Sequence, residues 1–535
     1  MSRLGWRGWG ALGTLIAAGS VGIALMKPGG GPARIDLGQA PEVRALHARA
    51  VRVAYGGPRG RLSGLVRLRA VASSSGARIA AVTYLLDGRP LGSDTTPPYA
   101  LDADLRFVSP GPHRLRVTAV DGLGRSGSGR NVRVVTSRGG GSVVTASPTS
   151  GLSTALDALR RGGTTVVLAP GRYVLDDVDL GDGARLIGSG PRTILAAPPG
   201  SSYFALLRVH GSGVRISQLT LDGGGAGPGE GFAVAVADGS SDVRLQRLRI
   251  VRVRGDGVDI WGRHSDVSVQ DSVIDGGGTA EAGVLALESR GSRDVSVIRT
   301  RIHRFRSYGI DFSQSAYGRT AAGLHALALD NRISDIRDPA HARCYTRPQL
   351  NGCGTNEAGI ESGAGAAAIV GNRISKAAWD GVETVGSSTR ATVAGNAIRQ
   401  TRTGIYLEHA TNLSLIAGNV VSDVRTGINV EWRYGGIGST RNRFVANRVV
   451  RARNTGLFLD VGADRNAVTA NLFVGGVRPA IVVQGSSLNV VRGNLACGSH
   501  GPFVREQFGM FDDGRPAQSK GNRIEGNVAE DQCRT

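Results

Sequence analysis

Short aliphatic runs recur at a nearly constant spacing from about residue 146 to the C-terminus. One series of positions is an asparagine shortly before an aliphatic residue, and a second is a glycine that opens another aliphatic run. The two series interleave, and several intervals between successive asparagines are 23–24 residues. The asparagines are Asn331, Asn372, Asn396, Asn419, Asn447, Asn471, Asn494 and Asn527. The glycines are Gly257, Gly309, Gly359, Gly381, Gly404, Gly427 and Gly456.

This period predicts an all-β fold for residues 146–535. Two or three short strands in each repeat are typical of a right-handed parallel β-helix, whose coils stack about 4.8 Å apart. No single coil buries its apolar face alone, so stacking makes the core. We expect the asparagines to be structural, because an asparagine at a corner adopts left-handed backbone angles and bonds its neighbours' amides along the stack.

A period of two marks the preceding segment, residues 41–137. Apolar and polar residues alternate at 65–72, 82–88, 113–121 and 132–136, with turn residues between the runs, which predicts a small β-sandwich. Characteristic positions are Tyr84, Asp87, Gly88, Pro98, Tyr99, Gly111, His113, Val117, Asp121 and Gly124. These residues resemble bacterial Ig-like modules, which implies a spacer or a weak binding unit. Its arginine-rich faces would meet anionic lipid, an anionic cell-surface polymer or solvent.

The start of the repeat region carries a second resemblance. Residues 151–163 have the pattern of an amphipathic helix, and Thr165 to Tyr173 follow as a strand with Pro170 and Gly171. The apolar face of the helix holds Leu152, Ala155, Leu156 and Leu159. This resembles the pectate-lyase-like β-helix superfamily, in which such a helix caps the apolar cylinder. The resemblance implies the fold but no single activity, because the superfamily includes lyases, hydrolases, epimerases and non-enzymatic binders.

The N-terminal residues 1–27 predict export. Residues 8–26 carry no charge, are long enough to cross a bilayer as a single hydrophobic helix, and follow Arg3 and Arg7. An uncleaved signal anchor and a cleaved signal peptide both fit this pattern. Residues 28–40 are rich in Gly and Pro and predict a linker. Either alternative makes the remaining chain extracytoplasmic, membrane-anchored or secreted.

The four cysteines agree with an oxidising compartment. Their proximity predicts two disulfides, Cys344–Cys353 and Cys497–Cys533. Zinc is a weaker alternative, because no Cys-x-x-Cys spacing occurs.

The net charge of +21 changes this picture little. Most of the excess lies near the N-terminus and is carried by arginine rather than lysine. Aromatic residues make up only 5% of the chain, and the sequence contains no helical or zinc-based motif for nucleic-acid recognition, so nucleic-acid binding is not expected. We expect a monomer.

Candidate chemistry follows from strand alternation. After each strand-opening glycine, the next residue faces the core, and the residues two and four positions after the glycine face outward. Carboxylates then lie roughly 5 Å apart on neighbouring coils and about 6.6 Å apart along one strand, separations similar to those in glycosidases. The outward positions are Asp259, Trp261, Asp311, Ser313, Glu361, Glu383, Tyr406, Glu408, Asn429, Glu431, Phe458 and Asp460.

The densest part of this file is residues 376–434. Carboxyl groups close together acquire different pKa values, so that one is protonated while another is ionised. Aromatic side chains offer apolar faces for sugar rings, and an arginine can pair with the carboxylate of a uronate. The predicted catalytic residues are Glu383, Glu408, His409, Glu431 and Arg433. The predicted substrate-binding residues are Trp379, Asp380, Tyr406, Trp432, Tyr434, Asp460, Asp311 and Glu361. Glu357 and Arg343, in the insertion at residues 334–358, are further candidates.

Three functions remain open. The first is an exported enzyme that cleaves or epimerises a polysaccharide. The second is a non-catalytic surface adhesin that binds a glycan. The third is a Ca²⁺-stabilised protein with the acidic file as an oxygen cage. A polar file that only meets solvent is the alternative to all three. The active-site patterns of polygalacturonases, calcium-dependent pectate lyases and mannuronan epimerases do not match.

Overall fold

The computed structural model falls into two compact units, residues 1–48 with 534–535 and residues 49–533. It describes residues 22–27, 30–36, 51–137, 143–225, 231–288, 293–312, 325–338, 357–386, 388–408, 410–431, 438–476, 479–498, 503–511 and 514–530.

The N-terminal unit contains an antiparallel pair of strands, β1 (Gly22–Lys27) and β2 (Gly30–Asp36). The hydrophobic helix predicted over residues 8–26 is therefore not supported. Its last residues are extended and paired in β1, and its other residues lie outside the described ranges. None of the helices in the described ranges is long and apolar enough to cross a membrane.

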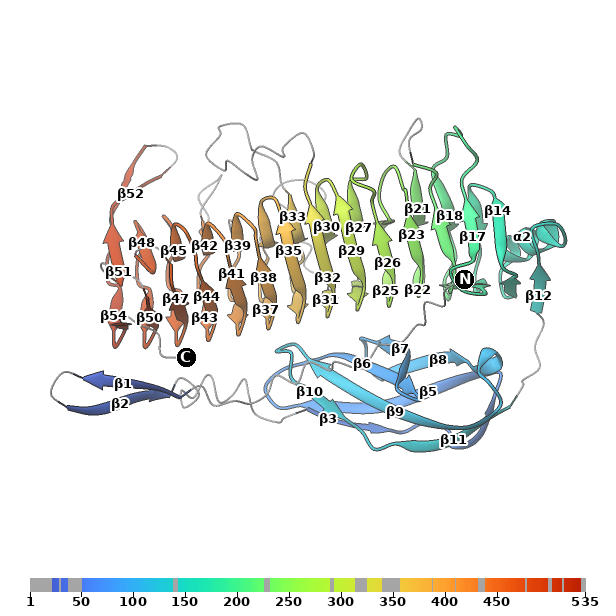
Figure 1. The fold of residues 1–535 in the computed structure, drawn as a ribbon, viewed down its shortest axis with the longest axis horizontal. Coiled ribbons are helices and arrows are strands. Elements are labelled where there is room, and N and C mark those ends of the chain that lie inside the picture. Colours follow the sequence, from blue (N-terminus) through green and yellow to red (C-terminus); the bar gives the residue numbers. More distant parts are fainter. Residues whose placement is uncertain are drawn as a thin grey trace, which may run out of the picture. The chain divides into compact units, whose positions relative to one another are not determined.

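The second unit begins with an Ig-like sandwich, which confirms the predicted β-sandwich (Figure 1). Alternation places Tyr84, Leu115 and Val117 in its core, each at most 1% exposed. One sheet contains β4 (Gly60–Ser63), β11 (Val132–Ser137), β9 (Gly111–Asp121), β6 (Ile79–Leu86) and β7 (Arg89–Asp94), with β10 (Ser126–Ser128) paired to β9. The other contains β3 (Val51–Tyr55), β5 (Leu65–Ser74) and β8 (Ala100–Asp104). The 3-10 turn η2 (Leu105–Phe107) follows β8.

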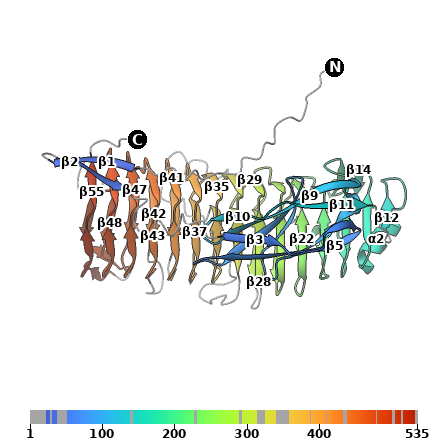
Figure 2. The ribbon, with the colours of Figure 1, turned by 90° about the horizontal axis from the view of Figure 1, so that it is seen from below.

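The rest of the second unit is a parallel β-helix, so the predicted right-handed parallel β-helix is confirmed. Each complete coil contributes one strand to each of three parallel sheets, and Figure 2 shows the coils following one another along one direction. The first sheet contains β12 (Val143–Ala146), β13 (Thr165–Leu168), β16 (Arg185–Gly188), β19 (Arg215–Ser217), β22 (Ser241–Gln246), β25 (Ser265–Gln270), β28 (Arg293–Ile298), β31 (Ala326–Leu329), β34 (Ala368–Val370), β37 (Thr392–Ala394), β40 (Leu415–Ala417), β43 (Arg443–Val445), β46 (Ala467–Thr469), β49 (Val490–Arg492) and β54 (Arg523–Glu525).

The second sheet follows the first along each coil. It contains β14 (Gly171–Val174), β17 (Thr193–Ala196), β20 (Thr220–Asp222), β23 (Arg249–Val251), β26 (Val273–Asp275), β29 (Arg301–Phe305), β32 (Arg332–Ile336), β35 (Arg373–Ala377), β38 (Ala397–Arg399), β41 (Val420–Ser422), β44 (Arg448–Val450), β47 (Leu472–Val474), β50 (Leu495–Cys497) and β55 (Val528–Glu530).

The third sheet completes each coil and carries the acidic file. It contains β15 (Val178–Leu180), β18 (Ala205–Val209), β21 (Phe232–Val236), β24 (Val258–Gly262), β27 (Ala282–Glu288), β30 (Tyr308–Phe312), β33 (Ala358–Ser362), β36 (Asp380–Thr384), β39 (Thr403–Leu407), β42 (Thr426–Val430), β45 (Thr455–Leu459), β48 (Ile481–Gln484) and β51 (Val504–Gln507). The short antiparallel pair β52 (Gly509–Met510) and β53 (Pro516–Ala517) follows β51.

The amphipathic segment at 151–163 forms α2 (Leu152–Arg161), as its spacing predicts. Its residues Ala155, Ala158 and Leu159 are buried in the core of the β-helix. Leu152 and Leu156 are partly buried and pack against the same core. The helix therefore covers apolar side chains of the first coil.

The asparagines form a ladder before the strands of the second sheet, as expected. Asn419 shows the pattern: its Nδ2 donates to Asn447 Oδ1 at 2.9 Å and to Val393 O at 2.8 Å, while its Oδ1 accepts from Asn396. The expected left-handed angles, however, lie on the residue before each asparagine and not on the asparagine itself. For Asn419 that residue is Gly418, with φ +61°. The left-handed residue makes the corner, and this leaves the asparagine free to bond along the stack.

A second ladder stands before the strands of the first sheet. Ser414 N donates to Asn442 Oδ1 at 2.9 Å, and the same backbone-to-amide contact recurs along the series at 2.8 Å. Its other members are Asn466, Asn489 and Asn522.

The glycine series has a packing cause. A Cβ on Gly404 would lie 2.2 Å from Val421 Cγ1 and 2.5 Å from the carbonyl oxygen of Gly427. Equivalent clashes, at 2.2–2.5 Å from a core side chain of the second sheet, recur at Gly257, Gly309, Gly359, Gly381 and Gly456. Only a residue without Cβ fits this corner between the second and third sheets.

Within the second unit, the Ig-like strands contact the first sheet of the β-helix. Ser93 N donates to Gln270 Oε1 at 2.9 Å, and Gln270 Nε2 returns a bond to Ser93 O at 3.0 Å. Arg299 donates to the hydroxyls of Thr83 and Ser93 at 3.3 and 3.1 Å. An apolar cluster adds to this contact and consists of Ala81, Ile298, Leu327, Leu329 and Val370.

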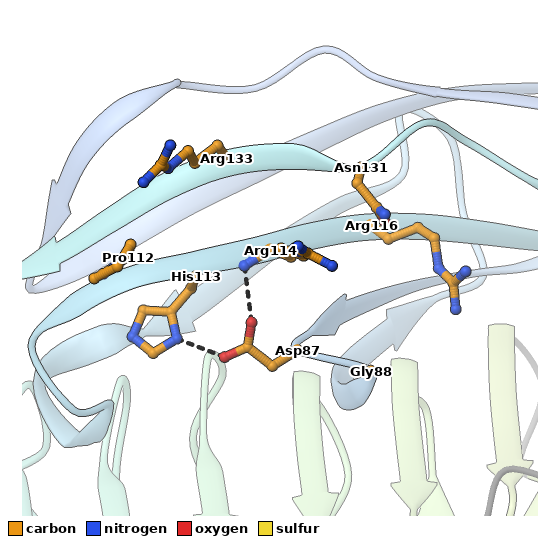
Figure 3. A pocket seen from close by; sticks show the side chains of 8 residues that line it. All are labelled: Asp87, Gly88, Pro112, His113, Arg114, Arg116, Asn131 and Arg133. Atoms are coloured by element: carbon orange, nitrogen blue, oxygen red, sulfur yellow. Dashed lines mark hydrogen bonds and ion pairs between the residues drawn. The ribbon is translucent and has the colours of Figure 1, made fainter.

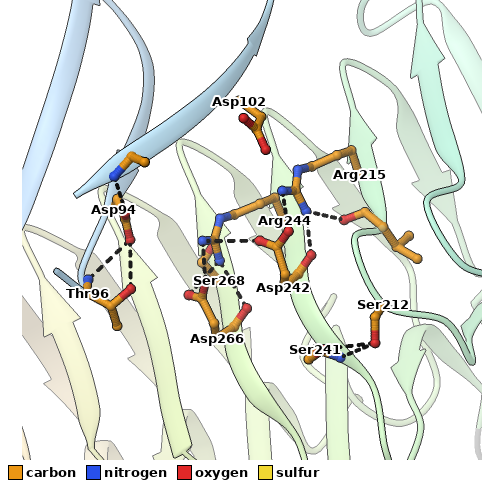
Figure 4. A network of polar contacts seen from close by, with 12 residues as sticks. Asp94, Thr96, Asp102, Ser212, Arg215, Ser241, Asp242, Arg244, Asp266 and Ser268 are labelled. Atoms are coloured by element: carbon orange, nitrogen blue, oxygen red, sulfur yellow. Dashed lines mark hydrogen bonds and ion pairs between the residues drawn. The ribbon is translucent and has the colours of Figure 1, made fainter. Parts of the chain in front are cut away.

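A charged network lies at the same contact (Figure 4). Arg244 bonds Asp266 Oδ1 at 2.7 Å and lies 3.4 Å from Asp242, which in turn pairs with Arg215 at 2.7 Å. Burial raises the pKa of Asp94 on the Ig-like side, although its bonds from backbone amides and the charge of Arg244 offset part of this rise. The network therefore places opposite charges across the contact.

Candidate functional site

The third sheet brings the predicted acids into one file. Residues two positions after the opening glycines pair residue for residue on adjacent strands, so their Cα atoms are spaced about 4.8 Å apart. Core residues one position earlier, such as Val382 and Ile405, are fully buried in the β-helix core, as alternation predicts. The file runs through Asp259, Leu285, Asp311, Glu361, Glu383, Tyr406, Asn429 and Phe458.

The acids two positions after the glycines are not exposed, which corrects the expectation that these outward-facing positions are accessible. Asp259, Asp311, Glu361 and Glu383 are only 3–7% exposed, and Tyr406 is 5% exposed. These side chains leave the core, but in-register stacking covers each of them with the side chains of neighbouring coils. The alternative of a file that only meets solvent is therefore wrong for these residues.

Burial strongly perturbs these carboxyl groups. It raises the pKa of Glu383 well above its ordinary value, and the nearby charges of Asp380, Glu361, Glu408 and Asp311 raise it further. Glu361 responds in the same way, although a hydrogen bond with Tyr308 offsets part of the rise. Burial among like charges therefore favours the protonated form of both carboxyl groups, compared with exposed glutamates.

Asp380 extends this cluster from the start of β36. It is fully buried, and burial raises its pKa to about 8, although Thr403 and the charge of Arg402 act in the opposite direction. Glu408 and Glu431 are among the charges that raise this pKa. Asp380 therefore titrates close to physiological pH.

Four carboxylate oxygens in the cluster are unsatisfied. Within the part of the chain that the structure describes, Glu361 Oε2, Glu383 Oε2 and both carboxylate oxygens of Asp380 are buried and have no hydrogen-bond partner. Such atoms cost free energy in a folded protein, about 1–3 kcal/mol each. Groups kept at this cost are candidates for function.

The rim of the cluster is accessible. Glu408 and Glu431 follow β39 and β42 and are each partly exposed. Glu431 Oε2 accepts hydrogen bonds from the Tyr406 hydroxyl at 2.7 Å and from Asn429 Nδ2 at 3.2 Å. The inner acids are thus buried, whereas these two carboxyl groups reach solvent.

An aromatic–cation pair adjoins the acids. The guanidinium carbon of Arg402 lies 3.5 Å from the centroid of the Trp379 indole ring. Both side chains are partly exposed. Because Arg402 also acts on Asp380 electrostatically, this pair belongs to the same site.

The structure thus brings together most of the predicted residues. Asp460 follows β45, three strands from Glu383, and accepts hydrogen bonds from Gln484 Nε2 at 3.0 Å and from the amide of Val461 at 2.8 Å, so its predicted role in the site stays a prediction. The residues assembled at the site are Asp311, Glu361, Trp379, Asp380, Glu383, Tyr406, Glu408 and Glu431. The predicted His409, Trp432, Arg433, Tyr434 and Arg343 lie outside the described residues.

The predicted disulfides stay predictions. Cys497 is buried in β50 and is not a free thiol. Cys344, Cys353 and Cys533 lie outside the described residues.

Sequence reasoning missed three groups at or near the site. Tyr308 bonds Glu361 and has a raised pKa because it is buried beside acids. Burial and the neighbouring Asp259 raise the pKa of Asp256 to about 8. Asp256, Tyr308 and Asp380 each stand directly before a strand-opening glycine, and this shared position is the signal that would have found them. Arg402 carries no such signal.

No metal centre emerges from the described ranges, where no group of three or more His, Cys, Asp and Glu side chains is arranged to hold an ion. The calcium alternative stays a prediction. Raised pKa values at Glu361, Glu383 and Asp380 disfavour the ionised oxygens that Ca²⁺ requires.

Comparisons with known proteins agree with this architecture. A family described as periplasmic copper-binding protein (NosD) matches residues 238–490 and 342–532, and a bacterial Ig domain family matches residues 52–117. None of the curated proteins gave a match.

Three solved structures illustrate the structural likeness. The A-module of mannuronan C-5 epimerase AlgE6 from Azotobacter vinelandii is 14% identical, with 71% of this chain and 94% of that chain covered and a TM-score of 0.45. A family 28 exopolygalacturonase from Yersinia enterocolitica is 10% identical, with 89% and 99% covered and a TM-score of 0.36. PfbA, a surface adhesin of Streptococcus pneumoniae, is 13% identical, with 68% and 88% covered and a TM-score of 0.41.

Proposed function

This chain belongs to the family described as periplasmic copper-binding protein (NosD), and from that premise we propose that it is an extracytoplasmic protein whose third sheet modifies a polysaccharide by acid–base chemistry. The family description supports the compartment. The observation that carries the activity is the buried cluster of carboxyl groups with raised pKa values beside the partly exposed Glu408 and Glu431.

The described residues do not fit copper. Copper sites in proteins use histidine, cysteine and methionine donors. Among the described histidines, His113, His210, His303 and His325 each lie beside a single aspartate, and His264 is buried. No grouping of ligands with metal-binding geometry occurs in those ranges. The proposed chemistry therefore involves only side chains of this protein.

The chemistry needs one group that donates a proton and one that accepts it. The pKa of Asp380 is raised to about 8, and that of Glu383 is also raised, because both groups are buried among like charges; the proton donor would be one of these two acids. Glu431 already accepts two hydrogen bonds, so its Oε2 acts as an acceptor in the resting site. Environments that push the pKa values of neighbouring carboxyl groups apart are the general basis of such a division of roles.

The accessible carboxyl groups define where the sugar is handled. Glu408 and Glu431 would contact the polymer, and the inner acids would supply or hold protons behind them. The partly exposed Trp379 ring, stacked with Arg402, offers an apolar face beside a positive charge. That combination suits an acidic sugar.

The test is a screen of the full-length protein against polyuronates and neutral glycans, with products analysed by mass spectrometry. Glu408→Gln and Glu431→Gln should each lower turnover by at least a hundredfold while the fold survives. Glu525→Gln is the matched control, because Glu525 is an exposed glutamate in β54 paired with Arg523. An unsaturated product identifies elimination and added water identifies hydrolysis. Full activity in both site variants would overturn the site assignment.

A second candidate function is glycan binding without turnover. It is favoured by the Trp379–Arg402 pair, which binds a sugar ring without any proton transfer. It predicts retention of a glycan with no product, unaffected by Glu408→Gln and abolished by Trp379→Ala.

A further inference from the structure

A pocket on the Ig-like domain lies outside the β-helix site. It has a volume of about 830 Å³ and lies along β9 and β11 (Figure 3). Its lining is strongly basic and contains no Phe, Tyr or Trp. The lining residues are Asp87, Gly88, Pro112, His113, Arg114, Arg116, Asn131 and Arg133.

The arginines of the pocket lie close enough to repel one another when no ligand is bound. Arg114 and Arg133 stand directly opposite each other on the antiparallel strands β9 and β11. Arg116 is two residues further along β9 and so shares the face of Arg114. Like charges directly opposite each other in a sheet are destabilising. The arrangement therefore calls for an anion to offset it.

No ion pair within the described part of the chain offsets the charge of these arginines. Among the described residues, none of the three guanidinium groups lies within ion-pair distance of a carboxylate, and all three side chains are exposed. Three exposed donors on one face are available to an outside ligand. Arginine binds carboxylate and phosphate groups through paired hydrogen bonds.

The one carboxylate in the lining is already committed. Asp87 Oδ2 bonds His113 Nδ1 at 2.6 Å, and Asp87 Oδ1 accepts from the backbone amide of Arg114 at 2.8 Å (Figure 3). These contacts hold the pKa of Asp87 below its ordinary value and raise the pKa of His113. Asp87 thus fixes the turn between β6 and β7 against β9 instead of bridging the arginines.

We propose that this pocket binds a carboxylate-bearing polysaccharide chain, as a second site separate from the acids of the β-helix. A membrane surface is disfavoured because the lining offers no apolar side chain larger than Pro112 for insertion. A nucleic acid is disfavoured because the lining holds no Phe, Tyr or Trp ring for base stacking, and its one imidazole, His113, is bonded to Asp87. A chain of repeated carboxylates matches a row of arginines on extended strands, and docking there tethers the protein to an acidic polymer.

The experiment measures retention of the full-length protein on immobilised polygalacturonate, a readout that does not depend on turnover. The double variant Arg114→Gln/Arg133→Gln should bind at least tenfold more weakly, and the wild-type affinity should fall as salt rises. The matched control is Arg52→Gln/Arg69→Gln, which removes the same charge from exposed arginines of the other sheet and should change the affinity less than twofold. Arg114→Lys/Arg133→Lys should recover only part of the affinity.

Two results would overturn the proposal. Equal weakening in the pocket and control variants would mean that only net charge matters. Binding to phosphatidylserine vesicles or to single-stranded DNA without retention on polygalacturonate would replace the polymer by another anion. Thermal melting of each variant checks that the fold is kept. Retention can be measured whether or not the β-helix acids turn over a polysaccharide, so failure of the proposed function and failure of this proposal are distinguishable.

Discussion

Tyr406, in the file itself, donates its hydroxyl to Glu431 Oε2 on the neighbouring coil at 2.7 Å. The contact joins a buried ring to a partly exposed carboxyl group, and so it fixes the direction of the group proposed to meet the substrate. The orientation of Glu431 is therefore set by the coil before it.

Removing this hydroxyl tests the positioning role. Tyr406→Phe should lower kcat ten- to a hundredfold with little change in KM, because Glu431 remains present but loses its orientation. Its stability cost should be only about 0.5–1.5 kcal/mol, the usual net value of one hydrogen bond. Steady-state kinetics and urea unfolding measure the two effects. Tyr173→Phe, which loses a buried hydroxyl near the helical cap, is the control and should leave kcat unchanged.

The buried Asp380 predicts a pH-dependent stability. Its folded pKa of about 8 lies above its ordinary value of 3.8, so its contribution is fully present below about pH 4 and is lost as the pH rises to about 8. Asp380→Asn should therefore be increasingly stabilising from pH 4.5 to pH 8.5, by an amount on the order of a few kcal/mol. Melting curves across this range provide the measurement.

The opposite sign is expected for Asp423. Its pKa is lowered, first by the hydrogen bond from Arg451, so Asp423→Asn should lose stability above about pH 4 and match the wild type at lower pH. A pH-independent difference for Asp380→Asn would contradict the burial argument.

The asparagine ladder should be sensitive to a single change. Asn419→Ala removes bonds from Nδ2 to two acceptors and leaves the amide of Asn396 without its partner. We expect a loss of about 2–5 kcal/mol in the free energy of unfolding. Asn454→Ala, at an exposed position outside the ladder, should change it by less than about 0.5 kcal/mol. Equal effects of the two substitutions in urea unfolding would refute the ladder's role.

The corner glycines should tolerate no side chain. Gly404→Ala places a methyl group 2.2 Å from Val421 Cγ1 and against backbone that cannot withdraw. A loss of about 2 kcal/mol or more is expected from this overpacking. Gly56→Ala is the matched control, because nothing lies within 4 Å of the added carbon. Similar melting temperatures for the two variants would show that the coils can shift to make room.

The arginines of the basic pocket should affect the stability of the protein as well as its binding. Arg133→Gln relieves repulsion with Arg114 directly across the sheet, so the protein without ligand should gain about 0.2–1 kcal/mol. Thermal melting at low salt measures this gain. A lower melting temperature would mean that Arg133 has a structural partner and that the pocket is not held ready for an anion.

The fold was predictable because two residue types, glycine and asparagine, recur along the repeats, and each is required for a different physical reason. Glycine is required where Gly404 meets Val421, and asparagine where Asn419 bonds along the stack. The corner angles were misassigned to the asparagines because an Asn tolerates left-handed angles, whereas in the structure residues such as Ala446 and Ala470 carry them. The second ladder escaped notice because it holds asparagine only from Asn442 onward, and Ser414 takes the equivalent position on the coil before.

The sequence predicted on which face of the strand the acids lie, but it did not predict how deeply they are buried. Alternation correctly turned Glu361 and Glu383 away from the core, since that depends only on neighbours in sequence. Their burial depends on coils far along the chain, which no local pattern records. The contact of Arg402 with Trp379 joins residues 23 positions apart in sequence, and no local pattern in either segment predicts it.

The ladder has a consequence for how such a chain diversifies. Asn331 and Asn372 are 41 residues apart and Asn372 and Asn396 only 24, yet both pairs bond through their amides at 3.0 Å. A coil can therefore lengthen by most of a turn at its corner without disturbing which strands are neighbours. New surface segments can be inserted or deleted between coils while the scaffold and its row of acids stay in place, so recognition can change independently of the fold.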